Sequence, residues 1–167
     1  TNRAVDEICE MLVDSDIPFL RLGSEYSCDE RFRPYLIEKA ISDCPKLEAI
    51  KQYIIGTRVI VGTTSMMTSK PFIFSLKHFK LAIIDESSQI LEPNLIGLLS
   101  AVDKFILIGD YKQLPAVVQQ SEQDSGIPTI NDSQKGGIID MSILQDICLT
   151  NCRNSLFERL YKIRKDD

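Results

Sequence analysis

Two carboxylates at the end of an apolar run constrain this chain more than any other feature. Residues 81–84 read LAII, and Asp85 and Glu86 follow them directly. An unbroken apolar run of this length indicates a strand that is buried on both faces of a parallel sheet. The two acids would then leave the strand at its carboxyl end, which is the edge where open α/β sheets bind their ligands.

A second apolar run repeats this arrangement further along the chain. Residues 105–108, FILI, lead into Gly109 and Asp110 and then into YKQLP, which contains Gln113. Parallel strands that deliver polar groups to one sheet edge form a site there. Nucleoside triphosphate hydrolysis requires a carboxylate suited to Mg²⁺, a second acid beside it and a nearby glutamine.

The remaining pattern alternates between helix and strand. Such alternation favours an α/β fold with a parallel sheet flanked by helices and right-handed crossovers. The sequence predicts helices at 4–13, from Glu92 onward, at 141–147 and at 155–163, and strands at 17–22, 58–62, 79–85 and 104–109. A loop or short element is expected over residues 66–78.

Two segments lie outside this alternation. Residues 24–55 are largely polar and charged, and we expect a small helical insertion there, with Pro34 and Pro45 each placed to begin a short helix. Residues 119–137 are rich in Gln, Ser, Asp and Gly and have no period, which predicts a flexible loop.

Charge and cysteine content limit the classes of partner. A net charge of −5 argues against a strongly basic nucleic-acid-binding patch. It leaves room for a contact made by hydroxyls and backbone amides. The odd number of cysteines, five, indicates reduced thiols in an intracellular protein, cytoplasmic or, in a eukaryote, also nuclear. We expect no metal bound by cysteine, and no membrane partner because no apolar run approaches ~20 residues.

Several motifs, taken in order, resemble those of the superfamily-1 helicases. LAIIDESSQ and FILIGDYKQLPAVV resemble motifs II and III, in the branch of the nonsense-mediated mRNA decay helicase and its DNA-processing relatives. TNRAVDEI resembles motif Ia, VGTTS resembles motif Ic, and NSLFERL resembles the segment before motif IV. These matches extend from Thr1 to Leu160 in the order of the family, and they imply a RecA-like P-loop NTPase fold.

The resemblance implies a role for each residue of the hydrolysis site, with ATP and Mg²⁺ as cofactors. Asp85 matches the Walker B aspartate, which holds Mg²⁺ through its water shell, and Glu86 matches the base that deprotonates the attacking water. Gln89 and Gln113 match glutamines on the γ-phosphate side, and Gln113 would couple hydrolysis to domain movement. Nucleotide-binding positions also fall on Gly109 and Asp110. Alternatively, Asp85 and Glu86 are solvated acids that end a strand, and Gln113 is a turn residue.

The same resemblance assigns four positions to single-stranded DNA or RNA. Thr1, Asn2, Thr63 and Thr64 match residues that contact the nucleic-acid backbone, a role that suits neutral donors because they hold phosphates without reading sequence. Each position has a structural alternative. Thr1 and Asn2 suit a helix cap, and Thr63 and Thr64 suit the satisfaction of backbone groups at a strand end.

Two family features are absent from the sequence. It contains no phosphate-binding loop of the form GxxxxGK(S/T), and no region resembling motifs IV to VI, which supplies the second RecA-like domain and the arginine finger. We therefore expect a truncated first motor domain that lacks the Walker A strand and is inactive in isolation. The parent protein would be an ATP-dependent helicase or translocase, moving 5′ to 3′ by analogy with the branch. The alternative is an inactive motor-like module that binds a protein or nucleic acid. Strand edges exposed by the missing strand would promote self-association.

Overall fold

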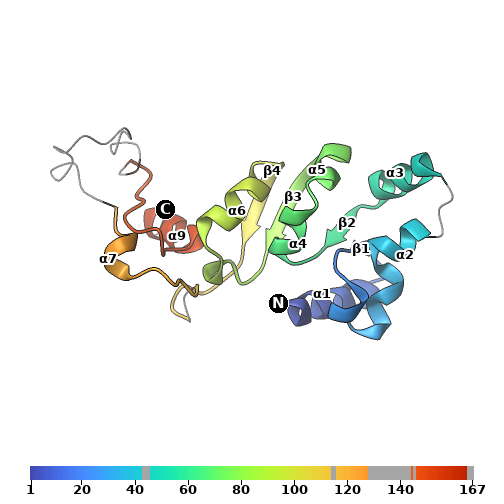
Figure 1. The fold of residues 1–167 in the computed structure, drawn as a ribbon, viewed down its shortest axis with the longest axis horizontal. Coiled ribbons are helices and arrows are strands. Elements are labelled where there is room, and N and C mark those ends of the chain that lie inside the picture. The colour runs from blue at the N-terminus through green and yellow to red at the C-terminus, as the bar shows by residue number, and fades with distance from the viewer. Residues whose placement is uncertain (43–45, 114–115, 128–143, 145, 165–167) are drawn as a thin grey trace. The chain divides into compact units, whose positions relative to one another are not determined.

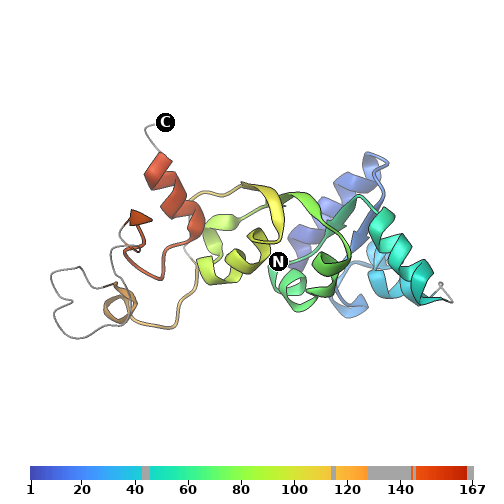
Figure 2. The ribbon, with the colours of Figure 1, turned by 90° about the horizontal axis from the view of Figure 1, so that it is seen from above.

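The computed structural model describes residues 1–42, 46–113, 116–127, 144 and 146–164. The chain divides into two compact units, Thr1–Phe79 (unit 1) and Lys80–Asp167 (unit 2), and each is described by itself. Figures 1 and 2 show the elements of both units in two views. None of the helices within the described ranges is long and apolar enough to span a bilayer.

Unit 1 is built on a pair of parallel strands. Helix α1 (Asn2–Asp14) buries Val5 and Cys9 and leads through a short turn into β1 (Phe19–Arg21). Strand β1 pairs in parallel with β2 (Val59–Val61), and Leu20 lies opposite Ile60. The sequence predicted this helix and both strands, and the structure confirms all three elements.

A buried ion pair fixes α1 against β1. The Arg21 side chain is fully buried at the end of β1, and a guanidinium nitrogen lies 2.8 Å from Asp6 Oδ1. The other carboxylate oxygen of Asp6 accepts a hydrogen bond of 3.1 Å from the backbone N–H of Asp29. Because Asp6 lies in the second turn of α1, the pair holds the start of the helix at the carboxyl end of β1.

The segment between β1 and β2 is helical. It contains η1 (Glu25–Ser27), η2 (Glu30–Tyr35), α2 (Ile37–Ser42) and α3 (Leu47–Gly56). Pro34 lies inside η2 instead of beginning a helix, because the Asp29 side chain caps η2 through the Arg31 N–H. Pro45 lies outside the described residues.

The chain after β2 forms two short helices over the segment expected to be a loop or short element. These are α4 (Thr64–Ser69) and α5 (Phe72–Leu76). Helix α5 packs against α3. The core of this half of unit 1 is apolar, and its fully buried members are Leu20, Leu22, Ile37, Ile54 and Ile73.

Unit 2 repeats the strand–helix–strand order. Strand β3 (Phe79–Ile84) is followed by η3 (Ser87–Gln89), α6 (Glu92–Leu99) and β4 (Val102–Leu107). Ile108 N donates to Ile84 O and Ile108 O accepts from Ser87 N, each at 2.8 Å. Ile108 thus bonds to the last residue of β3 and to the segment that follows β3, and bonding to two successive sites along the neighbouring chain is the pattern of parallel strands. The expected parallel α/β architecture is thus present, in two two-stranded sheets within the described residues.

The prediction that residues 81–84 are buried on both faces is wrong. Leu81 and Ile83 are 47% and 63% exposed, whereas Ile84 is buried. Helices α6 and α9 (Leu156–Arg164) supply apolar residues to a single cluster with Ile84. Side chains that alternate with Ile84 point to the opposite face of the sheet, which no described element of unit 2 covers.

The last part of the chain is described in pieces. The segment 119–137, expected to be a flexible loop, contains helix α7 (Glu122–Ser125), whose N-cap Ser121 accepts a hydrogen bond from Asp124 N. The residues from 128 onward in that segment lie outside the description, as does most of the helix predicted at 141–147. Helix α9 confirms the helix predicted at 155–163.

The buried cysteine of α1 gives a testable difference in thiol reactivity. Burial raises the pKa of Cys9 to about 11, while Cys148 and Cys152 are exposed. Because only the thiolate reacts, we expect Cys9 to be alkylated roughly a hundredfold more slowly at pH 8 than the two exposed cysteines. Mass spectrometry of iodoacetamide-treated protein measures this, and equal labelling before denaturation would contradict the buried position of Cys9.

Candidate functional site

The acidic pair follows β3 in the conformation of a tight turn. Asp85 and Glu86 are both exposed, and Asp85 Oδ1 accepts a hydrogen bond of 2.9 Å from Glu86 N. Glu86 adopts the left-handed backbone conformation, with φ 52° and ψ 33°. Residues other than glycine seldom adopt it, and such strain is concentrated at functional sites.

The glutamine of the same motif holds the Glu86 side chain. Gln89 Nε2 donates to Glu86 Oε2 at 3.1 Å, and Gln89 N donates to Glu86 O at 3.0 Å. Because Gln89 bonds one carboxylate oxygen, Glu86 is oriented while its other oxygen stays available. The turn therefore presents an oriented, exposed carboxylate next to a second one.

The loop after β4 packs directly against this turn. Both the backbone N–H and the hydroxyl of Ser87 donate to Ile108 O, each at 2.8 Å. A Cβ at Gly109 would lie 2.9 Å from Ser88 N, so that position accepts only a residue without a side chain. These contacts bring Asp85, Glu86 and Gln89 together with Gly109 and Asp110 at one edge of the β3–β4 sheet.

This close approach predicts a cost for any side chain at Gly109. We expect Gly109→Ala to lower the free energy of unfolding by about 1–3 kcal/mol, because the methyl group must displace the backbone of Ser88. Urea denaturation followed by circular dichroism measures the change. Gly97→Ala is the matched control, since a Cβ at Gly97 meets no atom within 4 Å. Equal stability of the two variants would contradict the packing of the two loops.

The turn that carries Gln113 is shaped by Asp110. Asp110 Oδ1 accepts from Lys112 N at 2.9 Å, and Asp110 O accepts from Gln113 N at 3.1 Å. Gln113 is exposed and lies six residues beyond the end of β4 at Leu107. Asp110 thus has a structural role in this turn, and the turn places Gln113 in the loop that packs on the acidic pair.

The four residues expected to contact nucleic acid lie in unit 1. Thr1 Oγ1 accepts from Ala4 N at 3.3 Å and caps α1, and Asn2 is the exposed first residue of that helix. Thr63 Oγ1 accepts from Met66 N at 3.2 Å and caps α4, and Thr64 is half-buried. The structural alternative for Thr1 and Thr63 is therefore realised, since both hydroxyls cap helices.

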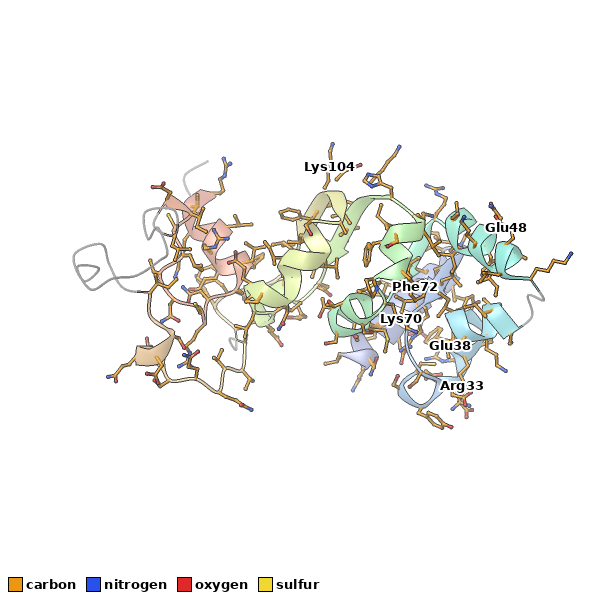
Figure 3. All side chains as sticks on the ribbon, turned by 45° about the horizontal axis from the view of Figure 1, so that its top comes forward. Arg33, Glu38, Glu48, Lys70, Phe72 and Lys104 are labelled. Atoms are coloured by element: carbon orange, nitrogen blue, oxygen red, sulfur yellow. The ribbon has the colours of Figure 1, made fainter. Side chains whose placement is uncertain are left out.

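The two caps share one edge of the β1–β2 sheet. The Asp6–Arg21 pair holds the start of α1 at the carboxyl end of β1, and Thr63 follows the parallel strand β2 at its carboxyl end. An open cavity of about 590 Å³ lies beside this edge, lined by residues such as Gly23, Ser24 and Met66. Lys70 and Glu38, labelled in Figure 3, form an ion pair of 2.9 Å in its wall.

Two ion pairs near these edges, which are partly or fully shielded from solvent, were not predicted from the sequence. One is Asp6 with Arg21 in unit 1, and the other is Glu92 with Arg159 in unit 2. The sequence offered one signal for the first pair, because Arg21 is a charged residue inside the short apolar segment FLRL. The second joins residues 67 positions apart, and no local pattern marks it.

Comparison with known proteins finds one matching family model and several similar helicases. Residues 46–121, which include both acids and both glutamines, match the model of a family described as an AAA domain. The chain is 34% identical over 127 residues to the DNA replication ATP-dependent helicase/nuclease DNA2 of Xenopus laevis, and 36% identical over 123 residues to that of Homo sapiens.

The yeast protein of the same name, from Saccharomyces cerevisiae, is 28% identical over 154 residues and matches 89% of this chain. The frog and human matches each cover 73% of this chain but 12% of the relative, so the chain spans about an eighth of the length of those curated relatives. The matched region and the order of its motifs agree, and together they support the resemblance of this chain to the superfamily-1 helicases.

Proposed function

We propose that this chain is part of an ATP-dependent helicase that couples ATP hydrolysis to movement along single-stranded nucleic acid. The observation that carries the proposal is the left-handed Glu86, exposed, oriented by Gln89 and packed beside the second loop. A general base must be held in a fixed orientation to take a proton from an attacking water, and the hydrogen bond from Gln89 supports this role for Glu86. A solvated acid at a strand end would need neither the strained backbone nor the bond from Gln89.

The donor set at this edge fits Mg²⁺ bound together with a nucleotide. Mg²⁺ commonly takes one or two carboxylates together with substrate phosphates, and Asp85 offers one exposed carboxylate beside the acid assigned as the base. When bound, the metal ion offsets charge on the β- and γ-phosphates. In this proposal Asp85 holds the ion, Glu86 takes the proton, and Gln89, Gly109 and Gln113 line the γ-phosphate side. Asp110 shapes the loop that carries Gln113.

We assign the second edge, in unit 1, to the nucleic-acid backbone. Thr1, Asn2, Thr63 and Thr64 carry hydroxyl and amide donors, which hold phosphates without reading sequence. DNA is favoured over RNA because the relatives are named for DNA replication. We further propose that the motor moves from 5′ to 3′ and works with a second RecA-like domain of the parent chain. The proposed location is intracellular.

The proposal is tested with the natural full-length protein and oligonucleotides of one sequence as single-stranded DNA and as RNA. ATP hydrolysis should rise on addition of single-stranded DNA, and should rise less with RNA. The double variant Thr63→Ala/Thr64→Ala should need more DNA for half-maximal stimulation, with Thr68→Ala, an exposed threonine of α4, as control. Binding of DNA without any ATP hydrolysis would overturn the proposed motor function and support the alternative of an inactive binding module.

We further infer that the 167-residue chain self-associates when it is isolated. The face of the β3–β4 sheet opposite its core exposes apolar side chains, namely Leu81, Ile83, Ile106 and Ile108. Contiguous apolar surface of this kind drives association. Sedimentation velocity should show a weight-average coefficient that rises with concentration, and Ile83→Lys should suppress the rise. A single monomeric species at high concentration would contradict the inference.

A further inference from the structure

Helix α9 is joined to the start of α6 by a partly buried two-point ion pair. Arg159 Nε donates to Glu92 Oε2 at 2.9 Å, and a second nitrogen of the same guanidinium donates to Glu92 Oε1. The Arg159 and Glu92 side chains are 10% and 15% exposed. The third nitrogen of Arg159 donates to Ile147 O at 2.6 Å. A two-point bond of this kind fixes direction as well as distance.

Backbone contacts place the start of α9 beside the acidic turn. Leu91, two residues after η3, forms an isolated antiparallel bridge with Ser155, and the buried Ser155 hydroxyl accepts from Glu158 N at 3.1 Å. Helix α9 also packs against η3 itself. The helix is therefore held to the segment that follows Glu86 by both main-chain and side-chain contacts.

An aromatic contact joins the same helix to the other loop. The rings of Tyr161 and Tyr111 have centroids 4.8 Å apart and planes inclined by 37°. Tyr111 lies between Asp110 and the glutamine at 113, inside the turn that Asp110 closes. One helix thus contacts both sides of the site, the first by packing against η3 and the second through Tyr161.

We propose that Tyr161 is a positioning residue for Gln113 and acts through Tyr111. Arg159 ties α9 to Glu92 at the start of α6, and Tyr161 extends from that fixed helix to the Gln113 turn. The spacing of the two loops is thereby set from outside the nucleotide site. A displacement of Gln113 during the reaction would move α9 through the tyrosine pair. This inference rests on the proposed function, because it concerns the same hydrolysis site.

The test is a double-mutant cycle in the natural full-length protein. Tyr111→Ala, Tyr161→Ala and the double variant are compared by kcat and KM for ATP in saturating single-stranded DNA. Each single variant is expected to lower kcat about tenfold with KM unchanged, and the double variant no more than about tenfold. A residue that only stabilised the fold would not give this separation of kcat from KM. A fall of about a hundredfold in the double variant would overturn the proposal, because two independent effects multiply.

Two further variants separate the ring contact from general damage to the helix. Tyr161→Phe keeps the ring and should retain kcat. Lys162→Ala changes a neighbouring exposed side chain that pairs with Glu158 of its own helix, and it should leave kcat unchanged. If the wild type shows no DNA-stimulated hydrolysis, the proposed function fails. If the wild type is active and Tyr161→Ala matches it, the positioning role alone is overturned.

Discussion

Replacement of Glu86 by glutamine is expected to lower DNA-stimulated ATP hydrolysis by the full-length protein by about 10²- to 10⁴-fold. The amide keeps the size of the side chain but cannot accept the proton of an attacking water. Binding of ATP should be retained, since the metal ion is assigned to Asp85. The measurement is steady-state phosphate release at saturating ATP, together with binding of a fluorescent ATP analogue.

Glu122→Gln is the matched control for this prediction, because it makes the same chemical change at an exposed position of α7. Its turnover should equal that of the wild type. If Glu86→Gln also turned over normally, Glu86 would be an ordinary strand-end acid, and the strained backbone at this position would need another explanation.

Removing the buried guanidinium of Arg21 should have the largest effect on stability. Arg21→Met leaves the Asp6 carboxylate without its partner, and breaking a buried pair in this way costs about 3–5 kcal/mol. Hydrogen exchange read by mass spectrometry should show faster exchange in peptides from α1 and β1. Arg31→Met, at an ion pair whose arginine side chain is 61% exposed, should leave the stability almost unchanged.

A double variant separates the cost of a lone charge from the worth of the pair. Asp6→Leu with Arg21→Met removes both charges, and buried pairs replaced by apolar residues often lose little stability. The double variant should recover only part of the free energy of unfolding that Arg21→Met loses, because Asp6 also accepts the hydrogen bond from Asp29 N. A double variant less stable than Arg21→Met alone would contradict this explanation.

The positions of the elements were largely predictable because they depend on local patterns. The apolar run before Asp85 ends where β3 ends, and Glu92 begins α6 as predicted. Local sequence also predicted that Gly109 and Asp110 follow the next strand. Strand order along the chain then brought the two loops to one edge, as parallel pairing requires.

The burial of those strands was not predictable, because it depends on which elements cover each face. The alternation of Ile83 and Ile84 between exposed and buried follows from helices on one face only. Ion pairs across 15 and 67 residues likewise leave no periodic trace in the sequence. The left-handed Glu86 is a further case, since the sequence there contains no glycine to mark it.

The two threonine caps affect how the protein could hold and release a single strand of nucleic acid as it moves. A hydroxyl has one hydrogen and two lone pairs, and Thr1 and Thr63 each use a lone pair to accept from a helix N–H. The hydrogen remains for a phosphate oxygen. In the proposed motor, neither helix would then have to fray when the strand is taken up or let go. Each step along the strand would be limited by exchange of hydrogen bonds with water, and the helix ends would stay formed throughout.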